Sequence, residues 1–178
     1  DGGLDAIFPA LTDRITTWRL QMVSTEPVER RVTSRATYYR FGLDYWQQLP
    51  DGRIALGGGR DKGGRDERDA PATPSPPVQA YLESLLRNRL DVHAPIEHRW
   101  AAQVGFSHDG LPLCEQVQPG VFALGGYCGT GNVVGALCAE DTVSRIAGGP
   151  SPFHDVIERA KSVVGGRLQL WPMTPLTE

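Results

Sequence analysis

The sequence predicts an α+β fold with a largely antiparallel, mixed sheet, a central helix, and a strand–glycine loop–helix near the C-terminus. Three observations indicate this fold. Segments rich in β-branched and apolar residues recur along the chain, short turn motifs join them, and only a few segments have helical periodicity. Short turns between successive strands are typical of antiparallel sheets, because parallel strands need long crossover connections.

The composition narrows the class of protein. The chain has 178 residues and a formal net charge of -3, which fits one domain with a buried core. The slightly acidic balance disfavours nucleic acid as a partner. No apolar run is long enough to cross a membrane, and the first residues do not resemble a signal peptide. Three cysteines without CxxC spacing favour a reducing, cytoplasmic compartment, and no histidine or cysteine spacing suggests a metal site.

The first half of the chain is predicted to form strands. Residues 1–14 read as a short helix or loop, and residues 15–27 as a strand that stops at Pro27. Pro50-Asp51-Gly52 separates two further strand-like runs. Proline sets φ, aspartate caps the turn and glycine accepts a positive φ, so this motif predicts a β-hairpin.

The middle of the chain is predicted to be a loop and a helix. Residues 60–77 are charged and then proline-rich, which predicts a solvated surface loop. From Val78 to Leu90 the apolar residues recur at close to i, i+3, i+4 and i+7 spacing, so we expect an amphipathic helix opened by Pro77.

Strands return in the second half. A long strand is expected over residues 94–107, with turns at residues 108–110 and 119–120 and short strands after each turn. Helices are expected over residues 131–146 and from Ser151, the predicted N-cap, to about residue 166. We expect a substrate-binding-like part over residues 1–120, a strand–loop–helix over 121–149 and a C-terminal extension over 150–178.

The glycine-rich stretch ALGGYCGTGNVVGALCAE, residues 123–140, raises the question of function. A glycine loop that leads into a helix presents free N–H groups and the positive end of the helix dipole, which suits an anion or an electron-rich oxygen. The same glycines would also allow a tight turn and close packing of the helix. Spacing alone does not decide between these explanations.

Three ordered blocks resemble a known family. They are LDYWQQLPDGRIALGGG (43–59), HRWAAQVGFSHDGLPL (98–113) and PGVFALGGYCGTGNVVGALCAE (119–140). Together they resemble the C-terminal half of the FAD-dependent amine and amino-acid oxidases of the D-amino-acid oxidase class, which includes glycine, sarcosine and γ-glutamylputrescine oxidases. RLQMVSTEP (19–27) is similar to a further strand of that family.

The resemblance implies a role for the glycine loop. In the family, the loop and the helix start contact the pyrimidine edge of the flavin, where N–H groups favour negative charge. Some members tether the flavin to a cysteine. Ala102 stands at about that place here, so a noncovalent FAD is implied. The implied cofactor residues are Gly126, Tyr127, Cys128, Gly129, Thr130, Gly131 and Asn132. We expect Cys128 to be a small packing residue, because no base for a nucleophilic role is visible.

The resemblance also bears on the substrate, an amine or amino acid. Members that oxidise simple α-amino acids hold the carboxylate with an arginine, and the matching position here is Gln103. Arg99 could replace it only for a long substrate, and a surface ion pair is the preferred interpretation. This shifts the expectation toward amines or larger amino compounds, with no catalytic base assigned.

Three aromatic residues remain as substrate candidates. Tyr45 and Trp46 alternate on a predicted strand, so that one can face a cavity while the other faces the core, and Trp100 has the same ambiguity.

The sequence lacks the Gly-x-Gly-x-x-Gly segment with which these enzymes bind the ADP half of FAD. With the start at Asp1 rather than methionine, this leads us to expect a substrate-side fragment that needs the Rossmann segment as partner and is inactive alone. A stand-alone binding module without redox chemistry is the alternative. The sequence leaves open whether the chain forms a homo-oligomer.

Overall fold

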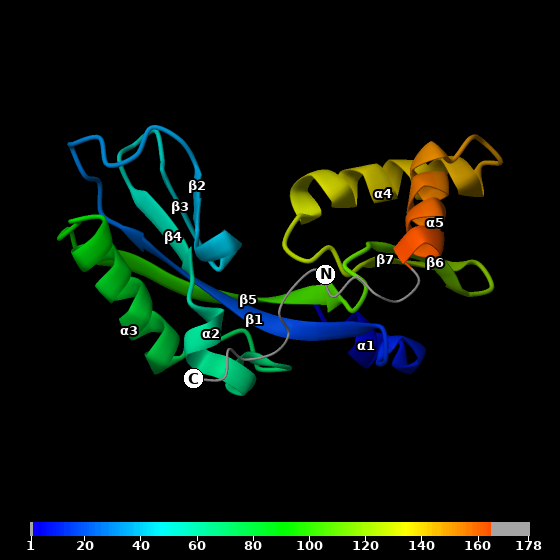
Figure 1. The fold of residues 1–178 in the computed structure, drawn as a ribbon, viewed down its shortest axis with the longest axis horizontal. Helices are drawn as coiled ribbons and strands as arrows, with labels where there is room; N and C mark the ends of the chain where they lie inside the picture. The colour runs from blue at the N-terminus through cyan, green and yellow to red at the C-terminus, as the bar shows by residue number, and fades with distance from the viewer. Residues whose placement is uncertain (1, 165–178) are drawn as a thin grey trace. The chain divides into compact units, whose positions relative to one another are not determined.

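The computed structural model describes residues 2–164. The chain divides into two compact units, one of Arg19–Ala102 and one of the described residues within Asp1–Trp18 and Gln103–Glu178. It passes from one unit to the other within two long strands, β1 (Ile15–Thr25) and β5 (Ile96–Ser107) (Figure 1). These units differ from the expected divisions at residues 120 and 149. Residues 165–178 of the expected C-terminal extension lie outside the described residues.

An antiparallel sheet with the strand order β2-β3-β4-β1-β5 forms the unit Arg19–Ala102. The strands β2 (Thr37–Tyr39), β3 (Asp44–Gln48) and β4 (Ile54–Gly58) pair with their neighbours in antiparallel register. The predicted hairpin is confirmed. Gly52 in its turn has φ of 92°, and Asp51 accepts a hydrogen bond of 3.1 Å from the N–H of Arg53.

Helix α3 (Pro76–Ser84) packs against one face of this sheet and continues as one π-helical turn, η4 (Leu85–Arg89). The predicted helix is thus confirmed, with its start one residue earlier. The core of the unit joins helix residues such as Val78 and Leu82 to strand residues such as Val23 and Leu56. Burial of these side chains fixes which sheet face is internal.

The prediction of a solvated surface loop over residues 60–77 is confirmed in part, because most of these residues are exposed. The segment nevertheless contains a short helix, α2 (Arg60–Gly63), and a 3-10 turn, η3 (Gly64–Glu67), which were not predicted. Glu67 is fully buried, and its two carboxylate oxygens accept hydrogen bonds of 2.7 Å from Arg19 of β1. A buried carboxylate needs such a partner, and this pair holds the segment against the sheet.

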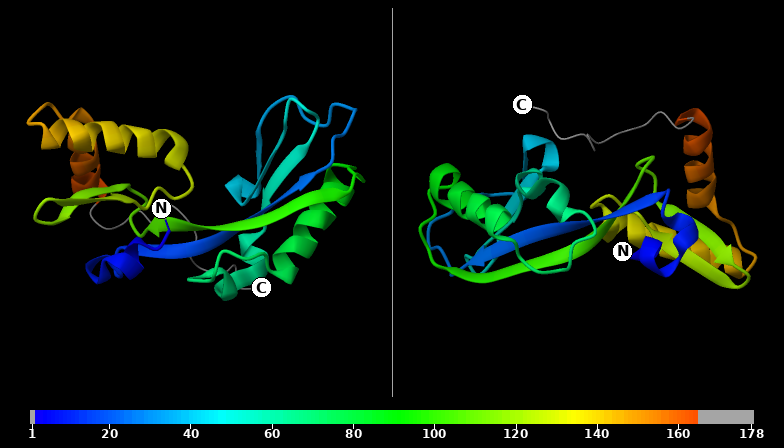
Figure 2. Two further views of the ribbon diagram at one scale, coloured as in Figure 1. Left: turned by 180° about the vertical axis from the view of Figure 1, so that it is seen from behind. Right: turned by 90° about the horizontal axis from the view of Figure 1, so that it is seen from below.

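The second unit is built from helices and one hairpin. Its elements are α1 (Leu4–Ile7), the turn η1 (Pro9–Leu11), β6 (Leu113–Gln118), β7 (Val121–Gly125), α4 (Gly131–Ile146) and α5 (Pro152–Val164). Strands β6 and β7 form an antiparallel pair, and α4 packs against both and against α5 (Figure 2). The predicted strands and the helix over residues 131–146 are confirmed.

The start of α5 corrects one detail. Ser151 precedes the helix as predicted, but its hydroxyl donates to Asp141 of α4. Asp141 also accepts a hydrogen bond of 3.0 Å from the N–H of Phe153, so this carboxylate satisfies a free donor at the start of α5. Within residues 2–164, no helix combines the length and the apolar character that a bilayer crossing requires.

Candidate functional site

The loop between β7 and α4, residues 126–130, has an unusual backbone. Gly126, Cys128 and Gly129 all have positive φ, of 66°, 52° and 88°. Glycine adopts this region without strain, which explains two of the three residues. The N–H of Cys128 donates to the carbonyl of Gly105 on β5 at 3.2 Å, so the loop is anchored to that strand.

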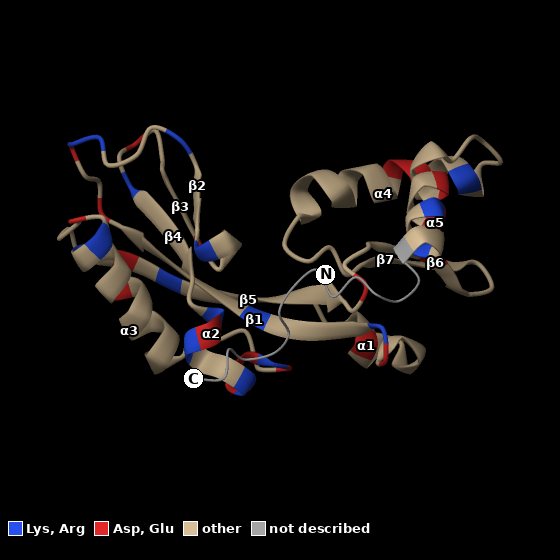
Figure 3. Cartoon of the chain, in the orientation of Figure 1, with Lys and Arg blue, Asp and Glu red and all other residues tan. Residues whose placement is uncertain are grey.

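The first turn of α4 has no side-chain cap. Thr130 is the N-cap residue, but its hydroxyl donates to the carbonyl of Tyr127 at 2.7 Å. The N–H groups of Gly131 and Asn132 open the helix and therefore have no intrahelical acceptor. No acidic residue lies in this turn, and the charged residues of α4 lie toward its other end (Figure 3). This helix start favours an electron-rich oxygen.

Two of the glycines make room for an aromatic ring. A Cβ on Gly131 or on Gly135 would lie 3.2 Å from an atom of the Tyr127 ring. The ring packs beside the buried Cys114 and Cys138, and burial raises the pKa of Tyr127 to about 12. Tyr127 is therefore a packing residue that holds the loop on the helix. The structure supports the tight-turn and packing explanation of the glycines, with close packing at Gly131 and Gly135 and a left-handed backbone at Gly126 and Gly129.

Cys128 points back toward β5. Its sulfur lies 3.4 Å from the hydroxyl oxygen of Ser107 and 3.4 Å from the carbonyl oxygen of Gly126. This orientation agrees with a packing role. Gly126 itself is enclosed, since a Cβ there would lie 3.3 Å from Ser107 and 3.5 Å from Ile15.

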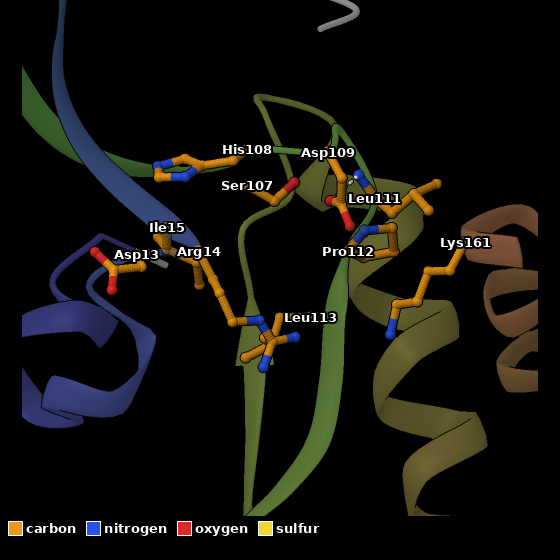
Figure 4. Close-up of a pocket in the computed structure, with 10 residues that line it drawn as sticks. All are labelled: Asp13, Arg14, Ile15, Ser107, His108, Asp109, Leu111, Pro112, Leu113 and Lys161. Atoms are coloured by element: carbon orange, nitrogen blue, oxygen red, sulfur yellow. Dashed lines mark hydrogen bonds between the residues drawn. The ribbon is translucent and has the colours of Figure 1, made fainter. Parts of the chain in front are cut away.

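A small pocket of about 100 Å³ lies beside this loop (Figure 4). Its arginine and its lysine are both paired, Arg14 with Glu115 and Lys161 with Glu158 at 2.8 Å. The pocket is smaller than typical cofactor sites, so we assign it no part in cofactor binding. Its lining residues are Asp13, Arg14, Ile15, Ser107, His108, Asp109, Leu111, Pro112, Leu113 and Lys161.

The structure separates the two adjacent aromatic candidates. Trp46 is 8% exposed and belongs to the core beneath α3. Tyr45 points to the opposite face of the sheet, because successive strand residues alternate. It is partly buried, and this burial raises the pKa of its phenol. Of the pair, Tyr45 is therefore the residue available to a ligand.

The remaining substrate candidates lie on β5. Arg99 forms an ion pair with Glu83 of α3 and donates to Gln79 at 3.0 Å, which is the surface pairing anticipated from the sequence. Trp100 is 38% exposed. Gln103 is exposed and belongs to the other unit, where Gly2 packs against it. The structure thus brings the loop residues 126–132 together, whereas Arg99 is bound to Glu83 and Gln79 of α3.

Sequence reasoning missed the neighbours of Tyr45. Tyr38 lies opposite it on β2, and Gly57 lies opposite it on β4, with Met22 of β1 beyond. Two signals in the sequence could have identified these neighbours of Tyr45. They are the alternation in the sequence TYYR and the strand register that the confirmed hairpin fixes.

Comparisons with known proteins agree with this architecture. Residues 3–145 match the family model described as FAD dependent oxidoreductase. The probable oxidoreductase OrdL of Rhizobium meliloti (strain 1021) is 29% identical over 122 residues, which are 68% of this chain and 27% of that protein.

Two solved structures share the fold. Glycine oxidase from Bacillus cereus ATCC 14579 has a TM-score of 0.64 at 15% identity, over 86% of this chain and 41% of its own. L-proline dehydrogenase from P. horikoshii has a TM-score of 0.55 at 18% identity, over 76% of this chain and 37% of its own. The chain spans less than half the length of each of these relatives. The family match takes in most of the chain, including the glycine loop, and the chain therefore belongs to the FAD-dependent oxidoreductase family.

Proposed function

We propose that this chain supplies the substrate-side sheet and a flavin-contacting loop of an enzyme that oxidises the C–N bond of an amine or amino acid. The observation that carries the proposal is the loop over residues 126–132. It has a left-handed backbone at three positions and leads into an uncapped helix start, within a family that uses FAD.

The residues present fit one edge of FAD. The N–H groups of Gly131 and Asn132 would face the electron-rich pyrimidine edge, and Gly129, where a Cβ would meet nothing within 4 Å, would allow close approach of the backbone. The chain has no Gly-x-Gly-x-x-Gly segment for the dinucleotide half. We therefore propose a Rossmann-type segment as its partner, and we expect this chain alone neither to hold FAD tightly nor to turn over. Ala102 carries no thiol, so the flavin is noncovalent in this proposal.

The outer face of α4 supports such a partner. Small and apolar residues repeat along it with the spacing of a helix-packing seam, at Ala136, Ala139, Val143 and Ile146. Val143 is 66% exposed and Ile146 is 61% exposed. The row begins about one helical turn after Asn132, the last residue of the proposed flavin contact, which fits a segment that carries the rest of the cofactor.

In this proposal the cofactor and the chain contribute different parts of the reaction. When bound, FAD would accept a hydride, which is one proton with two electrons, from the carbon next to the substrate nitrogen, while the nitrogen would lose one further proton, so that the C–N bond becomes the C=N bond of an imine that water hydrolyses. The chain orients the substrate on its sheet, and the start of α4 favours negative charge beside it. We assign no catalytic base. The cysteines Cys114, Cys128 and Cys138 are free thiols, which suits a reducing compartment, so a cytoplasmic location is part of the proposal.

The full gene product tests the proposal. We expect it to purify with flavin absorbance, which decreases under anaerobic conditions when a suitable amine or amino acid is added. The screen should cover primary and secondary amines as well as amino acids. A preparation that holds no flavin, or whose flavin no such compound reduces, would favour a non-catalytic binding module.

A further inference from the structure

The turn between β2 and β3 has a left-handed backbone. Arg40, Phe41 and Gly42, which form the 3-10 turn η2 (Arg40–Gly42), have φ of 47°, 57° and 85°. No other run of three residues with positive φ occurs within residues 2–164. Glycine adopts this region freely, whereas any other side chain brings its Cβ too close to the backbone and costs free energy. Surrounding contacts must therefore hold Arg40 and Phe41 in this conformation.

The side chain of Arg40 anchors the turn. Its guanidinium donates to Asp44 at 2.6 Å and 2.9 Å and to Asp61 of α2 at 2.8 Å and 2.9 Å. The guanidinium carbon lies 5.1 Å from the centroid of the Tyr81 ring, and Tyr81 of α3 donates to Asp44 at 2.8 Å. Gly58 makes room for Asp44, because a Cβ there would lie 2.5 Å from its Oδ1. The turn therefore has a rigid base.

This anchored turn holds the ring of Phe41 away from the protein. Phe41 is 98% exposed, although Asp44, three residues later, is fully buried. A single exposed apolar residue is common on protein surfaces. At this position, however, glycine would fit the backbone without strain, so the turn itself does not require a phenylalanine. Bulky residues in such a conformation are rare and cluster at functional sites, so the ring indicates a contact outside the described residues.

The charges beside Phe41 favour an apolar partner. Arg40 pairs with both Asp44 and Asp61. Lys62 pairs with Asp61 at 3.1 Å, so the base of the turn carries two positive and two negative charges. A charged partner would therefore meet no net charge at this place. An aromatic ring buried in an apolar pocket contributes strongly to binding, and a ring on a rigid turn loses little conformational freedom when it binds.

We propose that Phe41 anchors the unit Arg19–Ala102 to the remaining segment of the full gene product, which receives the ring in an apolar pocket. The chain spans less than half the length of the relatives described above, so most of such a protein lies outside the matched region. The inference rests on the proposed function, because that segment is the proposed Rossmann-type partner. The contact is additional to the one proposed for α4, which belongs to the other unit.

Hydroxyl-radical footprinting of the FAD-loaded full gene product tests the inference, because oxidation of a side chain depends on its exposure. The oxidation of Phe41 is compared with that of the same residue in a synthetic peptide of residues 36–48, which also contains the buried Trp46. We expect Phe41 to lose as much reactivity in the protein as Trp46 does. A Phe41 ring that reacts in the protein as it does in the peptide would overturn the inference.

Two matched variants give an independent readout. Phe41→Gly removes the ring and relieves the left-handed backbone, and Asp69→Gly relieves an exposed residue with φ of 51° in the same unit. The melting temperature of the full gene product should fall by several degrees for Phe41→Gly, because the lost contact outweighs the relief of strain. Asp69→Gly should leave it unchanged or raise it. A rise for Phe41→Gly as well would show that the ring stays in solvent.

Photo-crosslinking identifies the partner. With p-benzoylphenylalanine in place of Phe41, irradiation should join this position to a peptide of the full gene product outside residues 1–178. A crosslink to a second copy of the protein, or no crosslink at all, would overturn the inference.

The outcomes separate this inference from the proposed function. If an amine or amino acid reduces the flavin but Phe41 reacts as in the peptide, the inference is wrong and the proposed function stands. If the full gene product holds no flavin, or no such compound reduces it, the proposed function fails and the inference fails with it.

Discussion

Arg19 and Glu67 are joined by two hydrogen bonds of 2.7 Å in the interior of the unit Arg19–Ala102, although 48 residues separate them in the chain. Arg19 is 7% exposed and Glu67 is fully buried. Arg19 also donates to the backbone carbonyl of Thr73 at 3.2 Å, and Gln21 donates to Glu67 at 2.8 Å. This network fixes the segment that leads from β4 to α3.

Removal of one partner of this pair should destabilise the protein strongly. Arg19→Met leaves a buried carboxylate without its cation, and the expected loss is about 3–5 kcal/mol in the free energy of unfolding. The double variant Arg19→Met with Glu67→Leu should recover part of that loss, because no buried charge remains. Urea unfolding followed by circular dichroism measures both. Equal losses for the single and double variants would show that the ion pair does not act as a unit.

The same network predicts a dependence on pH. Burial raises the pKa of Glu67, but hydrogen bonds from Arg19, Gln21 and Ser75 outweigh burial and lower it below its ordinary value. The stabilisation is thus present above the unfolded-state pKa of about 4.3 and is lost as the pH falls through the lower folded-state value. Melting temperatures between pH 6 and pH 3 should therefore fall less steeply for Glu67→Gln than for the wild type. Parallel curves for the two proteins would contradict this assignment.

Cys128 offers a test of the loop. Its φ of 52° is unfavourable for a β-branched side chain, so Cys128→Val should cost about 1–2 kcal/mol of stability. Cys128→Ala keeps the backbone without strain beyond that of the cysteine and removes only the thiol. We expect it to retain flavin reduction by substrate, measured anaerobically. A complete loss of reduction in a folded Cys128→Ala protein would instead show that the thiol takes part in the chemistry.

Arg99 should be dispensable. Its ion pair with Glu83 lies at the surface, with the two side chains 37% and 36% exposed, and such pairs contribute about 1 kcal/mol or less. Arg99→Gln should therefore change neither stability nor the substrate KM appreciably. A rise in KM of about tenfold or more, with stability unchanged, would return Arg99 to the list of substrate residues.

Local chemistry explains what the sequence alone could predict. The hairpin at Pro50-Asp51-Gly52 follows from the dihedral preferences of three adjacent residues, and the helix over residues 131–146 begins and ends at glycine-rich segments. The glycine loop before this helix could also be predicted, because its glycines are adjacent in the sequence. Each of these features depends on residues that are close together in the chain.

The features that the sequence could not predict depend on contacts between distant residues. Alternation shows that Tyr45 and Trp46 face opposite ways, but only the position of α3 decides that Trp46 is internal. Glu67 lies among charged residues and became buried because Arg19 and Gln21 project from β1 toward it. The acceptor at the start of α5 likewise comes from Asp141 of α4, ten residues before Ser151.

The central claim is that the start of α4 contacts the flavin, and Asn132→Asp tests it most directly. An added negative charge in the first turn should stabilise the helix by about 0.3–1 kcal/mol, because it opposes the positive end of the dipole. The same charge would lie beside the electron-rich edge of the flavin and should weaken FAD binding by about tenfold. Asn88→Asp introduces the same charge in the other unit and serves as the control.

The deciding measurement is the dissociation constant of FAD for the full gene product and these two variants, obtained by titration of the flavin-depleted protein. The account predicts weaker binding for Asn132→Asp alone, with a melting temperature of its flavin-depleted form at or above that of the wild type. Unchanged FAD affinity in a folded Asn132→Asp protein would contradict the role assigned to residues 126–132.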